Sequence, residues 1–164
     1  MTDYSVIYDQ FKYRVERDAE FFEYLNLLPD IAEYVVEQRC ASLLNEAAAM
    51  FSLACPGSAG LMARSDDKKQ FTADLNQSEI FILAALMYQQ YMARDVAKIK
   101  TLNVNYTSTD LRVFDPSNAR ESFLALYEKV CLDNERLIDA YNNTDREKGG
   151  YLTIDYSAFT DNEE

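Results

Sequence analysis

The side chains that most often do chemistry in proteins are scarce in this sequence. Its 164 residues include no histidine, which removes the commonest general base and the commonest transition-metal ligand. Without histidine, neither a Ser-His or Cys-His nucleophile pair nor a Glu-x-x-His di-iron site can form. Of the four glycines, Gly149-Gly150 precedes a strand-like run rather than a helix, so no phosphate-binding loop is predicted. We therefore expect a protein that is not an enzyme and has no catalytic, metal-binding or cofactor-binding residues.

Carboxylates and thiols are the remaining reactive groups. Asp66-Asp67 is a close pair in a predicted loop, and carboxylates alone can bind Mg²⁺ or Ca²⁺, but a solvated turn is the simpler interpretation. The cysteines, Cys40, Cys55 and Cys131, are odd in number, and each falls within an apolar helical pattern. We expect them to be buried, reduced thiols.

The overall composition narrows the class of protein further. Hydrophobic residues make up 48% of the chain and charged residues 27%, which predicts a globular domain. The formal net charge of −12 argues against direct nucleic-acid binding, which needs clustered Lys and Arg. The N-terminus is polar, without the apolar segment of a signal peptide, so we expect synthesis in the cytoplasm and no association with a membrane.

The stretch from Gln77 to Lys100 predicts the central helix. Asn76 and Glu79 have the spacing of a capping box, in which each side chain accepts a hydrogen bond from the other's backbone N–H. The following run, residues 80–88, is apolar on every side, so this half of the helix must be covered by protein or lipid. The run is far shorter than the roughly 20 residues of a membrane span, and we expect other helices to cover it.

Three further amphipathic segments complete an all-α fold, a bundle of four main helices at about 3–18, 29–54, 77–100 and 116–141. The first carries an apolar stripe at helical spacing, the second begins near Pro29 and ends before Pro56-Gly57, and the last opens with Asp115-Pro116. The stripes of the first and last segments are Tyr4, Ile7, Tyr8, Phe11 and Val15, and Ala119, Phe123, Leu126, Tyr127, Val130, Asn134, Leu137, Ile138 and Tyr141.

Two long loops, 56–75 and 101–114, separate these helices, and a tail follows them. We divide the chain into a helical domain, 1–143, and an extended tail, 144–164, with Gly149-Gly150 as a hinge and a strand-like run at 151–156. A lone strand leaves backbone groups unpaired, so this run is either a loose end or pairs with another chain, and strand addition to another subunit is its expected use. The residues expected to make intersubunit contacts are Val104, Tyr106, Leu111, Phe114, Tyr151, Leu152, Ile154, Tyr156 and Phe159.

With the helices placed, the sequence resembles the small helical head-to-tail connector (adaptor or neck) proteins of tailed bacteriophages. The resemblance covers the opening helix from Thr2 to Phe11, the segment from Phe71 to Met87 and the run from Ser108 to Phe114. In the second segment an acidic-Leu pair precedes Glu79-Ile80-Phe81-Ile82-Leu83-Ala84. Where the family often has a Trp after the Met, this chain has Tyr91.

The resemblance implies a structural virion protein that acts at the neck, between capsid and tail. Identical subunits would form a ring, usually dodecameric, docked under the portal protein and joined below to the next neck component or a tail protein. Genomic DNA would pass through the channel without sequence-specific binding, which negative charge on the channel wall would suit.

An alternative class is a small acidic helical inhibitor that mimics DNA and occupies a basic cleft of a partner protein. Such a protein needs carboxylates clustered on one face at phosphate-like spacing. Here the 28 acidic residues are spread over several helices and interleaved with Lys and Arg, which counts against this alternative.

Overall fold

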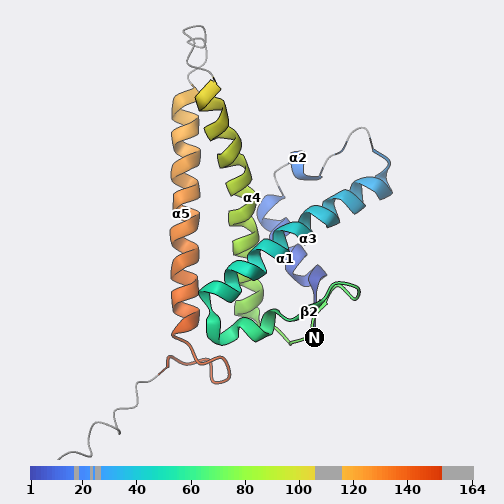
Figure 1. The fold of residues 1–164 in the computed structure, drawn as a ribbon, viewed down its shortest axis with the longest axis vertical. Coiled ribbons are helices and arrows are strands. Elements are labelled where there is room, and N and C mark those ends of the chain that lie inside the picture. Colours follow the sequence, from blue (N-terminus) through green and yellow to red (C-terminus); the bar gives the residue numbers. More distant parts are fainter. Residues whose placement is uncertain (17–18, 23, 25–26, 106–115, 153–164) are drawn as a thin grey trace, which may run out of the picture.

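A computed structural model of the chain describes residues 1–16, 19–22, 24, 27–105 and 116–152. It confirms the predicted all-α class, with four main helices and a small sheet (Figure 1). The elements are β1 (Thr2–Asp3), α1 (Tyr4–Val15), α2 (Ala19–Phe22), α3 (Pro29–Ala54), the 3-10 helix η1 (Pro56–Met62), β2 (Arg64–Ser65), β3 (Gln70–Phe71), α4 (Gln77–Asn105) and α5 (Pro116–Asn142).

Helix α4 is the central element, as the sequence predicts. Helices α1, α3 and α5 each pack against it. From Ile80 to Met87 every side chain of α4 is buried except Phe81. The helix begins with the predicted capping box, because Glu79 N–H donates to Asn76 Oδ1 at 2.9 Å and Asn76 N–H donates to Glu79 Oε2 at 2.8 Å.

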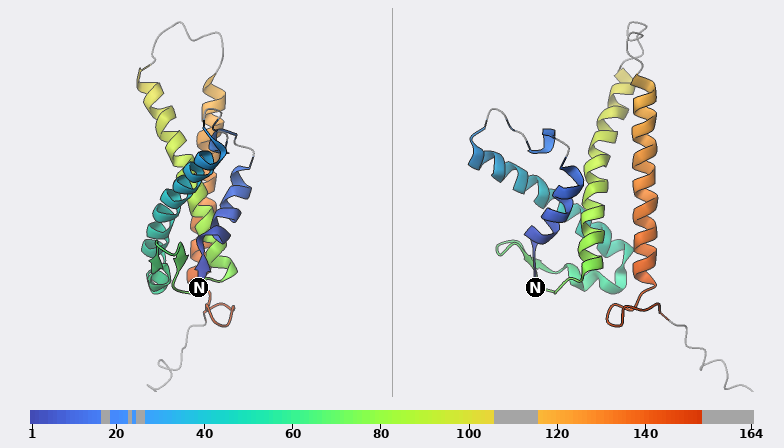
Figure 2. Two further views of the ribbon diagram at one scale, coloured as in Figure 1. Left: turned by 90° about the vertical axis from the view of Figure 1, so that its right-hand side faces the viewer. Right: turned by 180° about the vertical axis from the view of Figure 1, so that it is seen from behind.

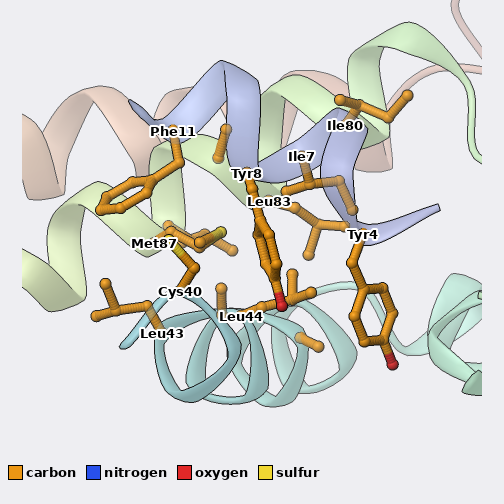
Figure 3. Close-up of a cluster of buried hydrophobic side chains, with 14 of the residues drawn as sticks. Tyr4, Ile7, Tyr8, Phe11, Cys40, Leu43, Leu44, Ile80, Leu83 and Met87 are labelled. Atoms are coloured by element: carbon orange, nitrogen blue, oxygen red, sulfur yellow. The ribbon is translucent and has the colours of Figure 1, made fainter. Parts of the chain in front are cut away.

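The core lies where α1 and α3 meet the first half of α4 (Figure 3). The predicted stripe of α1 is buried along its whole length, from Tyr4 to Val15. Small residues of α3 let the helices approach closely, with Ala47 and Ala48 both buried. The aromatic rings of Phe11, Phe21 and Tyr91 form a cluster of edge-to-face contacts, which adds specific geometry to the apolar burial.

A three-stranded antiparallel sheet in the order β1-β3-β2 replaces part of the predicted loop 56–75. Phe71 of β3 lies opposite Thr2 on one side and Arg64 on the other. Asp3 occupies the N-cap position of α1, and the hydroxyl of Thr2 before it accepts a hydrogen bond from Leu75 N–H at 2.8 Å. Strands of two residues are too short to show an alternating pattern, which is why the sequence gives no sign of them.

The C-terminal end of α4 differs from expectation. The predicted irregular segment 101–114 is wrong for residues 101–105, because α4 continues to Asn105 and places Val104 in its last turn. The remainder, 106–115, lies outside the described residues. Helices α4 and α5 run antiparallel along their length, while the first turns of α3 project away from them, on the side opposite α5 (Figures 1 and 2).

Candidate interaction surfaces

The structure describes three of the nine predicted contact residues. Tyr151 and Leu152 are exposed, with 82% and 58% of their surfaces accessible. Val104 lies on the last turn of α4. The other six, which are Tyr106, Leu111, Phe114, Ile154, Tyr156 and Phe159, lie outside the described residues.

The segment after α5 folds back on itself rather than extending from Thr144. Thr144 and Tyr151 form an antiparallel bridge, and Leu152 N–H donates to the Asn143 carbonyl at 2.8 Å. The Asp145 carboxylate accepts hydrogen bonds from the backbone N–H groups of Glu147 and Lys148, which lower its pKa. Gly149 has φ of +69°, which glycine adopts without strain. Residues 143–152 therefore form a closed turn, which we call the C-terminal turn, and 153–164 lie outside the described residues.

A buried carboxylate fixes this turn to the base of the bundle. Glu79 is fully buried, and Arg146 donates to it from Nε at 2.6 Å and from Nη2 at 3.2 Å. The same Arg146 Nη2 donates to the Asp74 carbonyl at 2.7 Å. The hydroxyl of Tyr141 donates to Glu79 at 2.8 Å and lies 3.0 Å from Ser58 Oγ. We call Asn76, Glu79, Tyr141 and Arg146, with Ser58, the Glu79 cluster.

Every polar group of the Glu79 cluster that is buried has a partner, as buried charges require. The hydrogen bond to Glu79 raises the pKa of Arg146, and burial together with the hydrogen bond to Glu79 raises the pKa of Tyr141. The cluster also borders a groove of about 480 Å³ between the start of α4 and the end of α5. Because the cluster's charges are matched internally, its role is to hold the C-terminal turn in place.

A second groove lies farther along the seam between α4 and α5. Arg14 of α1 borders it, with a floor and walls from Phe81, Ala85, Tyr88, Val130 and Leu137, in a cavity of about 470 Å³. A cavity of about 360 Å³ continues it along α4 and shares Arg14 and Tyr88. We call the two together the Arg14 groove; its remaining lining residues are Val15, Tyr91, Met92, Asp95, Phe123, Leu126, Asp133, Asn134 and Arg136.

Arg14 is held in this groove without a matching negative charge. Its guanidinium lies 4.6 Å from the centre of the Phe81 ring, a cation–π contact. Burial lowers the pKa of Arg14. No carboxylate pairs with it in the described part of the chain.

The start of α3 forms an exposed apolar surface that sequence analysis missed. Leu28 and Tyr34 are more than 60% exposed, and Leu27 and Ile31 are more than 40% exposed. We call Leu27, Leu28 and the first two turns of α3, 29–36, the α3 arm. The sequence does contain a signal for this surface. Ile31 and Tyr34 are apolar but lie outside the core-facing stripe that runs through Val36, Cys40 and Leu43. Apolar residues in excess of the core stripe indicate a second buried contact.

The cysteines and the Asp66-Asp67 pair, which the sequence analysis considered as reactive groups, take part in core packing or in hydrogen bonds within the chain. Cys40 and Cys55 are buried as predicted, and burial raises the pKa of Cys40 to about 11; Cys131 is only partly buried. Asp66 of the predicted solvated turn accepts a 2.7 Å hydrogen bond from the Tyr4 hydroxyl. Among the described residues, no three His, Cys, Asp or Glu side chains are grouped so that they could hold a metal ion. None of the described helices has an apolar stretch of the length that a membrane crossing requires.

Comparison with known proteins identifies no relative of this chain. No protein-family model matches it, and neither the curated proteins nor the solved structures contain a match.

Proposed function

We propose that this protein is a structural component of a tailed-phage virion, a head-to-tail connector subunit that joins the DNA-filled head to the tail. The observation that carries the proposal is the placement of exposed apolar side chains on two separate parts of one helical body. The α3 arm presents Leu28 and Tyr34, and the C-terminal turn presents Tyr151 and Leu152. A subunit of a multi-component assembly needs several contact surfaces, and the centres of such surfaces are apolar.

The sequence resemblance supports the same assignment. The segment from Phe71 to Met87 carries it, and in the structure this segment supplies β3, the capping box and the fully covered part of α4. The proposed partners are identical subunits in a ring, the portal protein above and the next neck component or a tail protein below. The proposed location is the virion neck, after synthesis in the host cytoplasm.

Analysis of virions and of a deletion phage tests this function. Mass spectrometry of purified virions should find the protein in a fixed ratio to the portal, with about twelve copies if the ring matches portal symmetry. Deletion of its gene should leave filled heads and free tails that fail to join, and the purified protein should restore joining in a lysate. Infectious particles that lack the protein would refute the proposal, and salt-sensitive inhibition of a nuclease or repressor would support the acidic-inhibitor class instead.

The C-terminal segment can be tested in the same joining assay. A stop codon after Leu152 removes 153–164 and leaves the Glu79 cluster complete, whereas a stop after Asn143 also removes Arg146. We expect the Leu152 truncation to fold with unchanged stability and to lose joining activity. If it joins heads and tails as well as the full chain does, residues 153–164 make no contact that assembly needs.

A further inference from the structure

Two surfaces of the molecule have complementary shape and charge. The Arg14 groove is a hollow with apolar walls. Arg136 at its edge is paired with Asp133 at 3.5 Å, whereas Arg14 has no carboxylate partner in the described part of the chain. The α3 arm is a projecting helix end with apolar side chains and two exposed carboxylates, Asp30 and Glu33. Neither carboxylate forms an ion pair within the described residues. In a chain of net charge −12, the unpaired guanidinium of Arg14 is complementary to the carboxylates of the α3 arm.

We propose that the α3 arm of one copy docks into the Arg14 groove of a second copy, with Ile31 and Tyr34 against the apolar walls and Asp30 and Glu33 facing Arg14. This contact joins two copies of the chain. Only its biological use rests on the proposed function. The contact does not depend on any other phage protein.

The dimensions of the two surfaces match. The groove follows α4 from Phe81 to Asp95, and at 1.5 Å per residue this stretch is about 21 Å long. The part of the arm in α3, residues 29–36, is about 12 Å long by the same measure. The groove can therefore receive the arm with room for Leu27 and Leu28 at its end.

The positions of the surfaces decide the kind of assembly. The arm projects from the side of the molecule opposite α5, whereas α5 forms one wall of the groove (Figures 1 and 2). The arm of a molecule therefore cannot fill its own groove. A contact between two different surfaces is heterologous, and repetition of it produces a closed ring or an open filament. A ring of identical subunits requires such a contact, while a symmetric pair of arms would stop at a dimer.

Disulfide cross-linking between differently labelled copies tests the contact. One copy carries Ile31→Cys, the other is isotope-labelled and carries Leu126→Cys, and both carry Cys131→Ser because Cys131 is only partly buried. The purified proteins are mixed at high concentration and treated with a mild oxidant, and mass spectrometry identifies the joined peptides. The matched control replaces Ile31→Cys by Leu53→Cys, which lies at the other end of α3 and is 84% exposed.

We expect the 31–126 cross-link to form between labelled and unlabelled copies, and to exceed the 53–126 cross-link by about tenfold. Arg14→Glu in the groove copy should reduce the 31–126 cross-link by about tenfold, and Glu33→Arg with Asp30→Arg in the arm copy should restore it. Circular dichroism confirms that each variant is folded, and Arg14→Gln replaces Arg14→Glu if the latter is not.

Three results would overturn the docking: equal cross-linking at 31 and 53, a predominance of 31–31 pairs, or no rescue by the reversed charges. Because the assay uses only this protein, its outcome is independent of the virion analysis. A positive cross-link with a protein absent from virions would keep the contact and refute the connector function.

Discussion

Two arginines that lie beside helix α4, Arg146 and Arg14, differ in whether their charge is paired with a carboxylate of the same chain. At the base, Arg146 donates to the buried carboxylate of Glu79 and to the Asp74 carbonyl. Along the seam, Arg14 lies over the Phe81 ring with no carboxylate paired to it in the described residues. The two regions adjoin, because Phe81 and Leu137 line both grooves.

The difference indicates that the charge of Arg146 is compensated within a single chain, whereas the charge of Arg14 is not. A buried charge is stable only when hydrogen bonds and an opposite charge compensate its loss of water. The Glu79 cluster meets this condition internally, so a partner could gain little there. Arg14 in the Arg14 groove is partly buried and has no carboxylate partner in the described residues, so an acidic group from a second copy would supply the missing opposite charge. Mutations should therefore affect folding at the base and association at the groove.

Glu79→Ala should have the largest effect on stability. The change removes the carboxylate that accepts from Asn76 N–H in the capping box and from Arg146, and leaves the Tyr141 hydroxyl with only Ser58 Oγ as an acceptor. We expect a loss of about 3 kcal/mol in the free energy of unfolding, or about 6–12 °C in Tm. Urea denaturation followed by circular dichroism measures it.

The matched control is Glu37→Ala, which removes an exposed pair with Lys69 at 2.6 Å. We expect this control to cost less than about 1 kcal/mol. Equal losses for the two variants would show that the Glu79 cluster is not the structural centre of the base.

Arg146→Ala should have the next largest effect. Glu79 would keep the Asn76 N–H and the Tyr141 hydroxyl but lose its positive partner. The Arg146 side chain is 39% exposed, so we discount the cost of a buried pair and expect about 2 kcal/mol. Amide exchange at Gly149 and Leu152 should accelerate more than exchange in α5. Lys148→Ala, whose ammonium lies 3.9 Å from Asp145 at an exposed position, should leave both measurements unchanged.

Tyr141→Phe should have a smaller effect that depends on pH. Loss of the hydroxyl removes one hydrogen bond to Glu79, worth about 1 kcal/mol at pH 7. The folded-state pKa of Tyr141 lies above the ordinary value of 10.0, so its contribution is complete below pH 10 and is lost as pH rises through the folded-state pKa. The variant should therefore lose stability less steeply than the wild type above pH 10. Tyr13→Phe, at an exposed position, should match the wild type throughout.

The sequence predicted the elements whose residues are close together in the chain. Periodicity located the buried face of α1, and the three-residue spacing of Asn76 and Glu79 located the start of α4. It did not predict the pairing of Glu79 with Arg146, because 67 residues separate them and no local pattern records such a contact.

The candidate site was predicted least well. Sequence analysis assigned the contacts to loops and the tail, where strand-like patterns stood out, and six of the nine residues lie outside the described part of the chain. It missed the α3 arm because Ile31 and Tyr34 lie within a helix already assigned to the core. It missed the Arg14 groove because a groove at a helix seam depends on which three helices meet. Both surfaces follow from tertiary packing rather than from local preference.

Arg14→Met should have the smallest effect on folding and provides the sharpest test of the contrast between the regions. Methionine keeps an apolar contact with the Phe81 ring and removes a partly buried charge, so the lost cation–π contact and the recovered desolvation cost oppose each other. We expect the free energy of unfolding to change by less than about 0.5 kcal/mol in urea denaturation. Self-association, measured by sedimentation equilibrium at high protein concentration, should weaken because Asp30 and Glu33 of the second copy lose their partner. A loss of more than about 1 kcal/mol with unchanged association would mean that Arg14, like Arg146, serves its own chain, and the two regions would then not differ in kind.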